Sequence, residues 1–84
     1  MLWVHCAHQD YMDLEASHDY RLFESMKQAN EWVERMKEAY TSGDVWIIGP
    51  ATQKELLRYI RDYDLSVDEA TMKNINNKDY YQTL

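Results

Sequence analysis

The feature that most constrains the fold is an amphipathic pattern between Ser25 and Tyr40. Apolar side chains recur there at spacings of three and four residues and form one stripe: Met26, Ala29, Val33, Met36 and Tyr40. Ser25 and Gln28 form a capping box, in which the Ser hydroxyl and the Gln amide satisfy backbone N–H groups left free where a helix begins. The pattern predicts one helix over about residues 26–41, which must bury its stripe against another element.

Strand-like patterns lie on both sides of this helix. Leu2, Val4 and Cys6 alternate with less apolar neighbours, which predicts a strand over residues 2–8 with those three side chains facing the core. Residues 20–23 predict a second strand that returns from a long hairpin. The apolar run at 45–48 predicts a third, central and well-buried strand. Gly43 is expected to end the helix by taking a positive φ.

Two further capping patterns begin at Thr52 and Ser66. They predict a helix to about Tyr63 and a short helix through about Ile75. The whole pattern predicts an α+β fold, in which an antiparallel three-stranded sheet of order ββαβ packs on one long helix and is followed by two short helices. An alternative extends the long helix back to Asp19 and leaves a parallel βαβ unit with a right-handed crossover. The Ser25 capping box favours the antiparallel arrangement. We expect one domain over 1–75 and a loose polar tail over 76–84.

Composition narrows the class of protein. Cys6 is the single cysteine among 84 residues, so no internal disulfide can form, as is usual in a reducing cytoplasm. Neither a signal peptide nor a membrane span is predicted. The net charge of −6 disfavours direct binding to nucleic acid or to an anionic membrane. No glycine-rich phosphate loop or catalytic motif stands out. We therefore expect a cytoplasmic protein that is not an enzyme and needs no cofactor.

The charge is concentrated in one acidic segment between Gln9 and Glu24. Five acids and one base give this segment a net charge of −4 out of the total of −6. A concentrated anionic patch projects a field toward basic partners. We expect the segment to bind a protein, with carboxylates imitating the phosphates of a nucleic acid and tyrosines adding contact area. The candidate residues are Asp10, Tyr11, Asp13, Glu15, Asp19, Tyr20 and Glu24.

Two alternatives remain for the acidic segment: a solvated loop that keeps the protein soluble, and a contact that uses only a few of these acids. A second and weaker acidic group straddles the turn between the last two predicted helices and is partly offset by nearby bases. It consists of Asp62, Asp64, Asp68 and Glu69. Acids at the start of a helix, such as Asp68 and Glu69, are also expected because they complement the helix dipole.

Histidines near Cys6 raise the question of a metal site. Alternation along a strand places His5 on the opposite face from Cys6 and His8, and His18 would have to come across the hairpin. We therefore expect no metal site, and a buried, unreactive Cys6.

A different class of function is a structural or assembly module. Trp3, Trp46 and Ile48 lie on neighbouring predicted strands and could form an apolar sheet face that joins two copies of the chain. The alternative is that a C-terminal helix covers this face.

The acidic segment 10–24 and the group 62–69 give the chain a general resemblance to small acidic inhibitors that bacteriophages make early in infection. Several of these inhibitors mimic DNA and block host nucleic-acid-binding proteins. The resemblance implies a viral protein in the host cytoplasm whose partner is a basic nucleic-acid-binding protein, for example a nucleoid protein, a polymerase or a nuclease. Arg58, Arg61, Lys73 and Lys78 depart from the acidic pattern in the C-terminal half.

Overall fold

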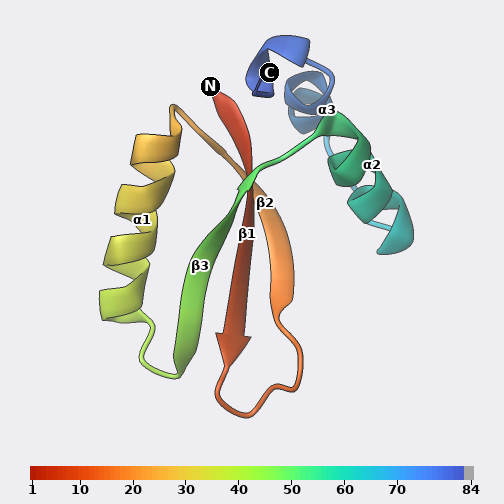
Figure 1. Cartoon of the computed structure of the whole chain (residues 1–84). Helices are drawn as coiled ribbons and strands as arrows, with labels where there is room; N and C mark the ends of the chain where they lie inside the picture. Colours follow the sequence, from red (N-terminus) through yellow and green to blue (C-terminus); the bar gives the residue numbers. More distant parts are fainter. Residues whose placement is uncertain (83–84) are drawn as a thin grey trace.

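A computed structural model describes residues 1–82 and contains a three-stranded antiparallel sheet with helices on both faces (Figure 1). The strands are β1 (Leu2–Asp10), β2 (Ser17–Phe23) and β3 (Gly43–Pro50), in the order β2-β1-β3. The predicted α+β class and the ββαβ order are confirmed. The prediction of a central strand at 45–48 is wrong, because β1 is central and β3 is an edge. The run is also less buried than predicted, because Ile48 is 49% exposed. An apolar run does not indicate how many strands flank it.

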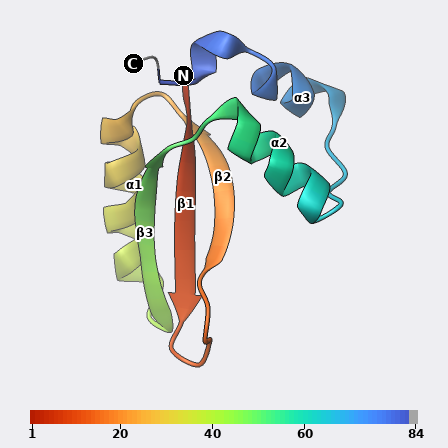
Figure 2. The same cartoon turned by 45° about the vertical axis from the view of Figure 1, so that its right-hand side comes forward.

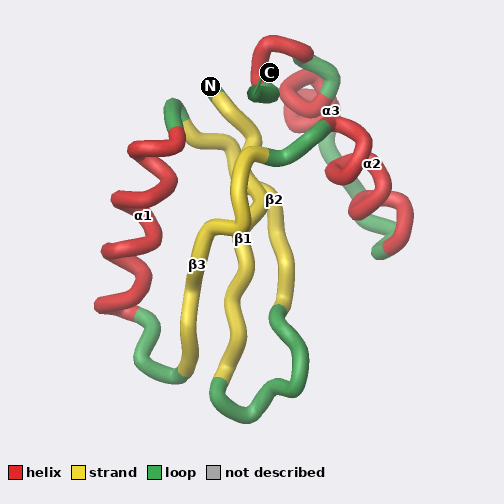
Figure 3. Tube along the Cα trace, viewed as in Figure 1, coloured by secondary structure: helices red, strands yellow, loops and turns green. Residues whose placement is uncertain are grey.

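The helices are α1 (Met26–Ala39), α2 (Gln53–Asp62), α3 (Glu69–Ile75) and a short 3-10 helix, η1 (Lys78–Tyr80) (Figure 3). The predicted cap of α1 is confirmed, because Ser25 Oγ accepts from the Gln28 N–H at 3.2 Å. The capping box predicted at Ser66 is wrong. Asp68 caps α3 instead, and its carboxylate accepts from the Thr71 N–H at 2.7 Å. A carboxylate at this position also complements the helix dipole, which a serine does not.

One face of the sheet packs against α1. Its buried cluster consists of Val4, Cys6, Phe23 and Ala29, and the half-buried Leu2, Met26, Trp32 and Ile47 surround it. The predicted inward set of Leu2, Val4 and Cys6 is therefore confirmed. The stripe of α1 provides the other half of this layer, as an amphipathic helix requires.

The opposite face is covered over part of its length by the C-terminal helices (Figure 2). Trp3, Ala51, Leu56 and Ile75 form the buried cluster there. The indole Nε1 of Trp3 donates a hydrogen bond to the Asn74 carbonyl at 2.9 Å. Trp3 is buried, so its predicted role at an exposed dimer face is wrong, and the alternative of a covering helix is confirmed for this residue.

The C-terminal segment contributes to the same layer. Tyr80 and Tyr81 pack against the Trp3 cluster, and the Tyr81 hydroxyl donates to the Ile75 carbonyl. The predicted loose tail is therefore wrong over 76–82, and residues 83–84 lie outside the described residues. The segment has a polar composition, but its two adjacent tyrosine rings provide apolar area that a composition argument underrates.

Close approach of the backbone, rather than a positive φ, explains Gly43. Within the described residues, positive φ angles occur at Gly49 and Asp64, so the predicted positive φ at Gly43 is wrong. A Cβ on Gly43 would lie 2.0 Å from the Gln9 carbonyl oxygen. Glycine is thus required where β3 begins beside the end of β1.

The pairing of β1 with β3 contains a bulge. His5 lies opposite Gly49 and Cys6 lies opposite Ile47, which leaves Ile48 as the extra residue of β3. Ile48 is 49% exposed. Trp46 lies opposite Ala7 and is half-buried.

Candidate functional site

A highly exposed segment is the hairpin tip, residues 11–16, which connects β1 to β2 at the end of the sheet remote from η1 (Figure 1). Tyr11, Met12 and Leu14 are 74%, 92% and 99% exposed. The side chains of Asp13 and Glu15, which alternate with them, are exposed as well. The tip therefore presents large apolar groups and carboxylates together to solvent.

Hydrogen bonds hold the base of this tip. The Asp13 N–H donates to the Asp10 carbonyl at 3.0 Å, and Gln9 Nε2 donates to the Asp13 carbonyl at 3.0 Å. The Tyr11 N–H donates to the Ser42 carbonyl at 3.0 Å, which joins the tip to the turn after α1. Polar groups of the backbone are thus satisfied while the side chains of the tip project outward.

Asp10 anchors the same region. Its carboxylate accepts from the Tyr40 hydroxyl and, at 3.3 Å, from Ser42 Oγ. The hydrogen bond to this carboxylate raises the pKa of Tyr40 above its usual value, because loss of the phenolic proton would place two negative charges side by side. Asp10 therefore combines a negative charge with a structural contact.

The sheet adds one acid that the sequence prediction missed. Asp44 is exposed and lies opposite Gln9 in the β1–β3 register. With Asp10, Asp13 and Glu15 it forms what we call the acidic end. Among residues 1–82 none of these four carboxylates takes part in an ion pair. No local signal marks Asp44, because only strand pairing brings it to this end.

The remaining residues of the acidic segment do not join this end. Asp19 forms an ion pair with Arg21, in which Asp19 Oδ2 lies 3.1 Å from Arg21 Nη2. Tyr20 lies on the opposite face of β2, and its ring stacks on His5 with 4.6 Å between centroids. Glu24 follows the other end of β2, just before α1. Successive strand residues point to opposite faces, so a continuous stretch of acids cannot form one continuous patch here.

The weaker C-terminal acidic group is also used within its own helices. Asp62 Oδ2 lies 3.5 Å from Arg58 Nε, and Asp62 Oδ1 lies 3.6 Å from Arg61 Nε. Asp64 takes a positive φ in the turn after α2. Asp68 caps α3, and Glu69 lies in its first turn. The local bases and helix ends thus account for these acids.

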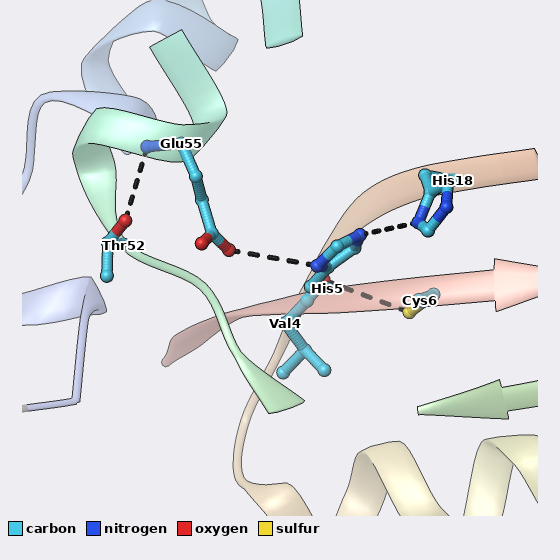
Figure 4. Close-up of polar contacts among 6 residues, drawn as sticks. All are labelled: Val4, His5, Cys6, His18, Thr52 and Glu55. Atoms are coloured by element: carbon cyan, nitrogen blue, oxygen red, sulfur yellow. Dashed lines mark hydrogen bonds and ion pairs between the residues drawn. The ribbon is translucent and has the colours of Figure 1, made fainter. Parts of the chain in front are cut away.

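A second arrangement lies in what we call the imidazole cleft, between α2 and the β1–β2 pair. The cleft has a volume of about 580 Å³ and is lined by His5, His18, Tyr20, Glu55, Arg58, Tyr59, Asp62 and Tyr63. His5 Nε2 lies 2.8 Å from His18 Nδ1, and His5 Nδ1 lies 3.9 Å from Glu55 Oε1 (Figure 4). Burial lowers the pKa of His5, and Glu55 opposes this effect. The structure thus brings His18 across the hairpin and adds Glu55 from a distant helix.

Cys6 lies on the other face, where a cavity of about 190 Å³ separates β2 from α1. Its thiol is buried, as predicted. Burial raises the pKa of Cys6 to about 11, with a further contribution from Asp19. The thiol is therefore protonated at neutral pH, whereas a nucleophilic cysteine reacts as the thiolate.

Trp32 lines the same cavity. It is half-buried, with its ring 5.7 Å from that of Phe23 and the Arg21 guanidinium 4.8 Å above it. Its contacts are thus largely within the fold.

Comparisons with protein-family models, with characterised proteins and with solved structures gave no significant match. Within residues 1–82, no group of three or more His, Cys, Asp or Glu side chains is gathered as a metal site. Over the same residues, no helix has the length and apolar character needed to cross a bilayer.

Proposed function

We propose that the protein is a non-enzymatic binding module that docks its acidic end onto a basic surface of another protein. The observation that carries this proposal is the exposure of Tyr11, Met12 and Leu14 beside the carboxylates of Asp13 and Glu15. Within residues 1–82 neither carboxylate takes part in an ion pair. A loop that only keeps a protein soluble needs no large apolar side chains. Burying Met12 or Leu14 against a partner would contribute about 1.5–3 kcal/mol each.

The carboxylates and the apolar side chains of the hairpin tip contribute differently to binding a partner. The four carboxylates of the acidic end steer the encounter with a basic surface and reject acidic partners. The apolar side chains lengthen the lifetime of the complex, because apolar burial does not weaken as salt screens the charges. The more specific form is inhibition: the acidic end occupies a surface where a nucleic acid would otherwise bind, and so competes with DNA.

The proposal is tested by affinity capture from nuclease-treated bacterial lysate, with captured proteins identified by mass spectrometry. The wild type is compared with Asp13→Asn/Glu15→Gln and with a matched control, Glu31→Gln/Glu34→Gln on α1. Both variants remove two negative charges. Capture is repeated at about 0.1 M and 1 M salt, between which the Debye length falls from about 10 Å to about 3 Å.

We expect the wild type and the control to retain one basic nucleic-acid-binding protein at low salt, which added DNA displaces. The Asp13→Asn/Glu15→Gln variant should retain much less of it. Equal capture by all three proteins would show that the acidic end is not part of the interface with the partner. Capture that resists both salt and DNA would refute competition with nucleic acid.

A second candidate function is self-assembly through the edge strand β3. The observation that favours it is the bulged Ile48, which is 49% exposed beside the half-buried Trp46. Sedimentation velocity over a range of protein concentrations tests this candidate. A dimer that Ile48→Lys converts to monomer would support it, and a monomer at every concentration would refute it.

A further inference from the structure

We propose that His5 and His18 together bind a divalent first-row transition-metal ion, such as Zn²⁺ or Ni²⁺, across the β1–β2 hairpin. The two imidazoles come from neighbouring strands and face each other at 2.8 Å between His5 Nε2 and His18 Nδ1 (Figure 4). The site lies in the imidazole cleft and is independent of the acidic end, so it goes beyond the proposed function.

The spacing of the two nitrogens is close to what a shared metal requires. With metal–nitrogen bonds of about 2.0–2.1 Å, two ligands of a tetrahedral ion lie about 3.3 Å apart. The pair therefore has to open by about 0.5 Å, and each ring has to turn so that its lone pair points about 35° away from the line between the two nitrogens. His18 is exposed, so its side chain can make this adjustment without repacking the core.

Glu55 favours the tautomer of His5 that binds metal. Its carboxylate lies 3.9 Å from His5 Nδ1, on the side of the ring away from His18. At this distance the two atoms form no hydrogen bond, but the negative charge of the carboxylate favours a proton on Nδ1, which leaves the lone pair of Nε2 directed toward His18. Thr52 fixes the start of α2, because its Oγ1 accepts from the Glu55 N–H at 3.2 Å. Glu55 is thus a positioning residue.

His18 contributes the second ligand through Nδ1, the nitrogen that faces His5. This nitrogen carries a free lone pair in the tautomer that has its proton on Nε2. Its backbone is held in place, because the Tyr59 hydroxyl donates to the His18 carbonyl at 3.1 Å. The strand pairing of Ala7 with His18 and of His5 with Tyr20 fixes the diagonal relation of the two imidazoles.

The ligand set defines the class of metal. Imidazole nitrogens favour Zn²⁺, Ni²⁺, Co²⁺ and Cu²⁺, whereas Mg²⁺ and Ca²⁺ prefer oxygen ligands. Two protein ligands leave coordination positions open toward the cleft, and water fills them. The bound metal is therefore exchangeable and is removed by EDTA. It connects β1 to β2 and so stabilises the hairpin by binding only the folded chain.

The test is isothermal titration calorimetry of the folded protein with ZnCl₂, NiCl₂ and MgCl₂ at neutral pH, together with thermal unfolding with and without each metal. The variants are His18→Gln, which removes an exposed ligand, and Glu55→Gln, which removes the positioning carboxylate. The matched control is His8→Gln, on the same strand as His5 but among the residues that line the Cys6 cavity.

We expect Zn²⁺ and Ni²⁺, but not Mg²⁺, to bind the wild type and the control and to raise Tm by several degrees, with full reversal by EDTA. His18→Gln should lose this binding. Glu55→Gln should weaken it about tenfold or more while Tm without metal changes little. Absence of Zn²⁺ and Ni²⁺ binding to the wild type would overturn the proposal. So would equal binding by His18→Gln, which would place the metal elsewhere.

Discussion

Replacing Ile75 by alanine tests whether the C-terminal helices belong to the folded core. Ile75 is 1% exposed and belongs to the cluster of Trp3, Ala51 and Leu56. The change deletes three carbon atoms, which at about 0.8 kcal/mol each corresponds to about 2.4 kcal/mol of lost burial. The residual cavity adds to this, within a usual range of about 2–5 kcal/mol. The neighbours come from separate elements and cannot easily collapse, so we expect a loss of about 3–4 kcal/mol.

This loss is large for a domain of 84 residues, whose free energy of unfolding is on the order of 4–13 kcal/mol. The assay is urea unfolding followed by circular dichroism, with the slope m compared between proteins to confirm that only stability has changed. Ile48→Ala is the matched control, because it deletes the same atoms from a side chain that is 49% exposed. The control should lose about 1 kcal/mol or less.

A loss below about 1 kcal/mol for Ile75→Ala would refute the reasoning. It would mean that α3 and η1 lie against the sheet without stabilising it. Equal losses for Ile75→Ala and Ile48→Ala would contradict it as well, because the difference in burial should outweigh the few tenths of a kcal/mol by which helix and strand propensities differ between the two sites.

Three further predictions concern single residues. The Cys6 thiol should react with Ellman's reagent at pH 8 far more slowly in the folded protein than in denaturant, and a rate equal to that of the unfolded chain would contradict its burial. Because its pKa rises from 9.0 to about 11 on folding, the unfolded state ionises first, and urea midpoints should fall as the pH rises through this window. Gly43→Ala should cost about 1–3 kcal/mol in urea unfolding, since its Cβ would meet the Gln9 carbonyl at 2.0 Å; an unchanged midpoint would argue against that contact. Asp68→Ala should lower Tm, and Asp68→Asn should restore most of the loss, because both Asp and Asn can accept from the Thr71 N–H. Hydrogen bonds from Thr71 lower the pKa of Asp68, so the advantage of the wild type over Asp68→Asn, which depends on the charge, should be present above pH 3.8 and be lost as the pH falls through the lowered pKa; a Tm difference between these two proteins that persists in strong acid would contradict this role of the charge.

Part of the candidate site could be predicted from the sequence. The density of acids between Gln9 and Glu24 correctly indicated the segment that contains the hairpin tip. Acid density alone does not show that Asp19 and Tyr20 point to opposite faces of β2, or that Asp19 is paired with Arg21. Those facts depend on where the second strand begins. The prediction began β2 at residue 20, whereas pairing with β1 extends it to Ser17.

The imidazole cleft was less predictable still. The alternation of β1 correctly separated His5 from Cys6, but the partner of His5 on its own face depends on hairpin register, which aligns Ala7 with His18. Glu55 belongs to a helix 50 positions further along the chain and approaches His5 only because α2 packs over this face. No short-range pattern encodes that contact.

Local sequence patterns were enough to predict the main helices and strands and their order. Alternation along β1, the stripe of α1 and the Ser25 cap act through side-chain direction and backbone hydrogen bonding within a few residues, so they can be recognised without knowing the fold. The central place of β1, the burial of Trp3 and the position of Asp44 at the acidic end depend instead on contacts between distant parts of the chain. The Trp3 indole and the Asn74 carbonyl are separated by 71 positions. Such contacts form because each apolar face has to be buried against another element of the chain. A local pattern shows which face will be buried, but it does not show which element will pack against it.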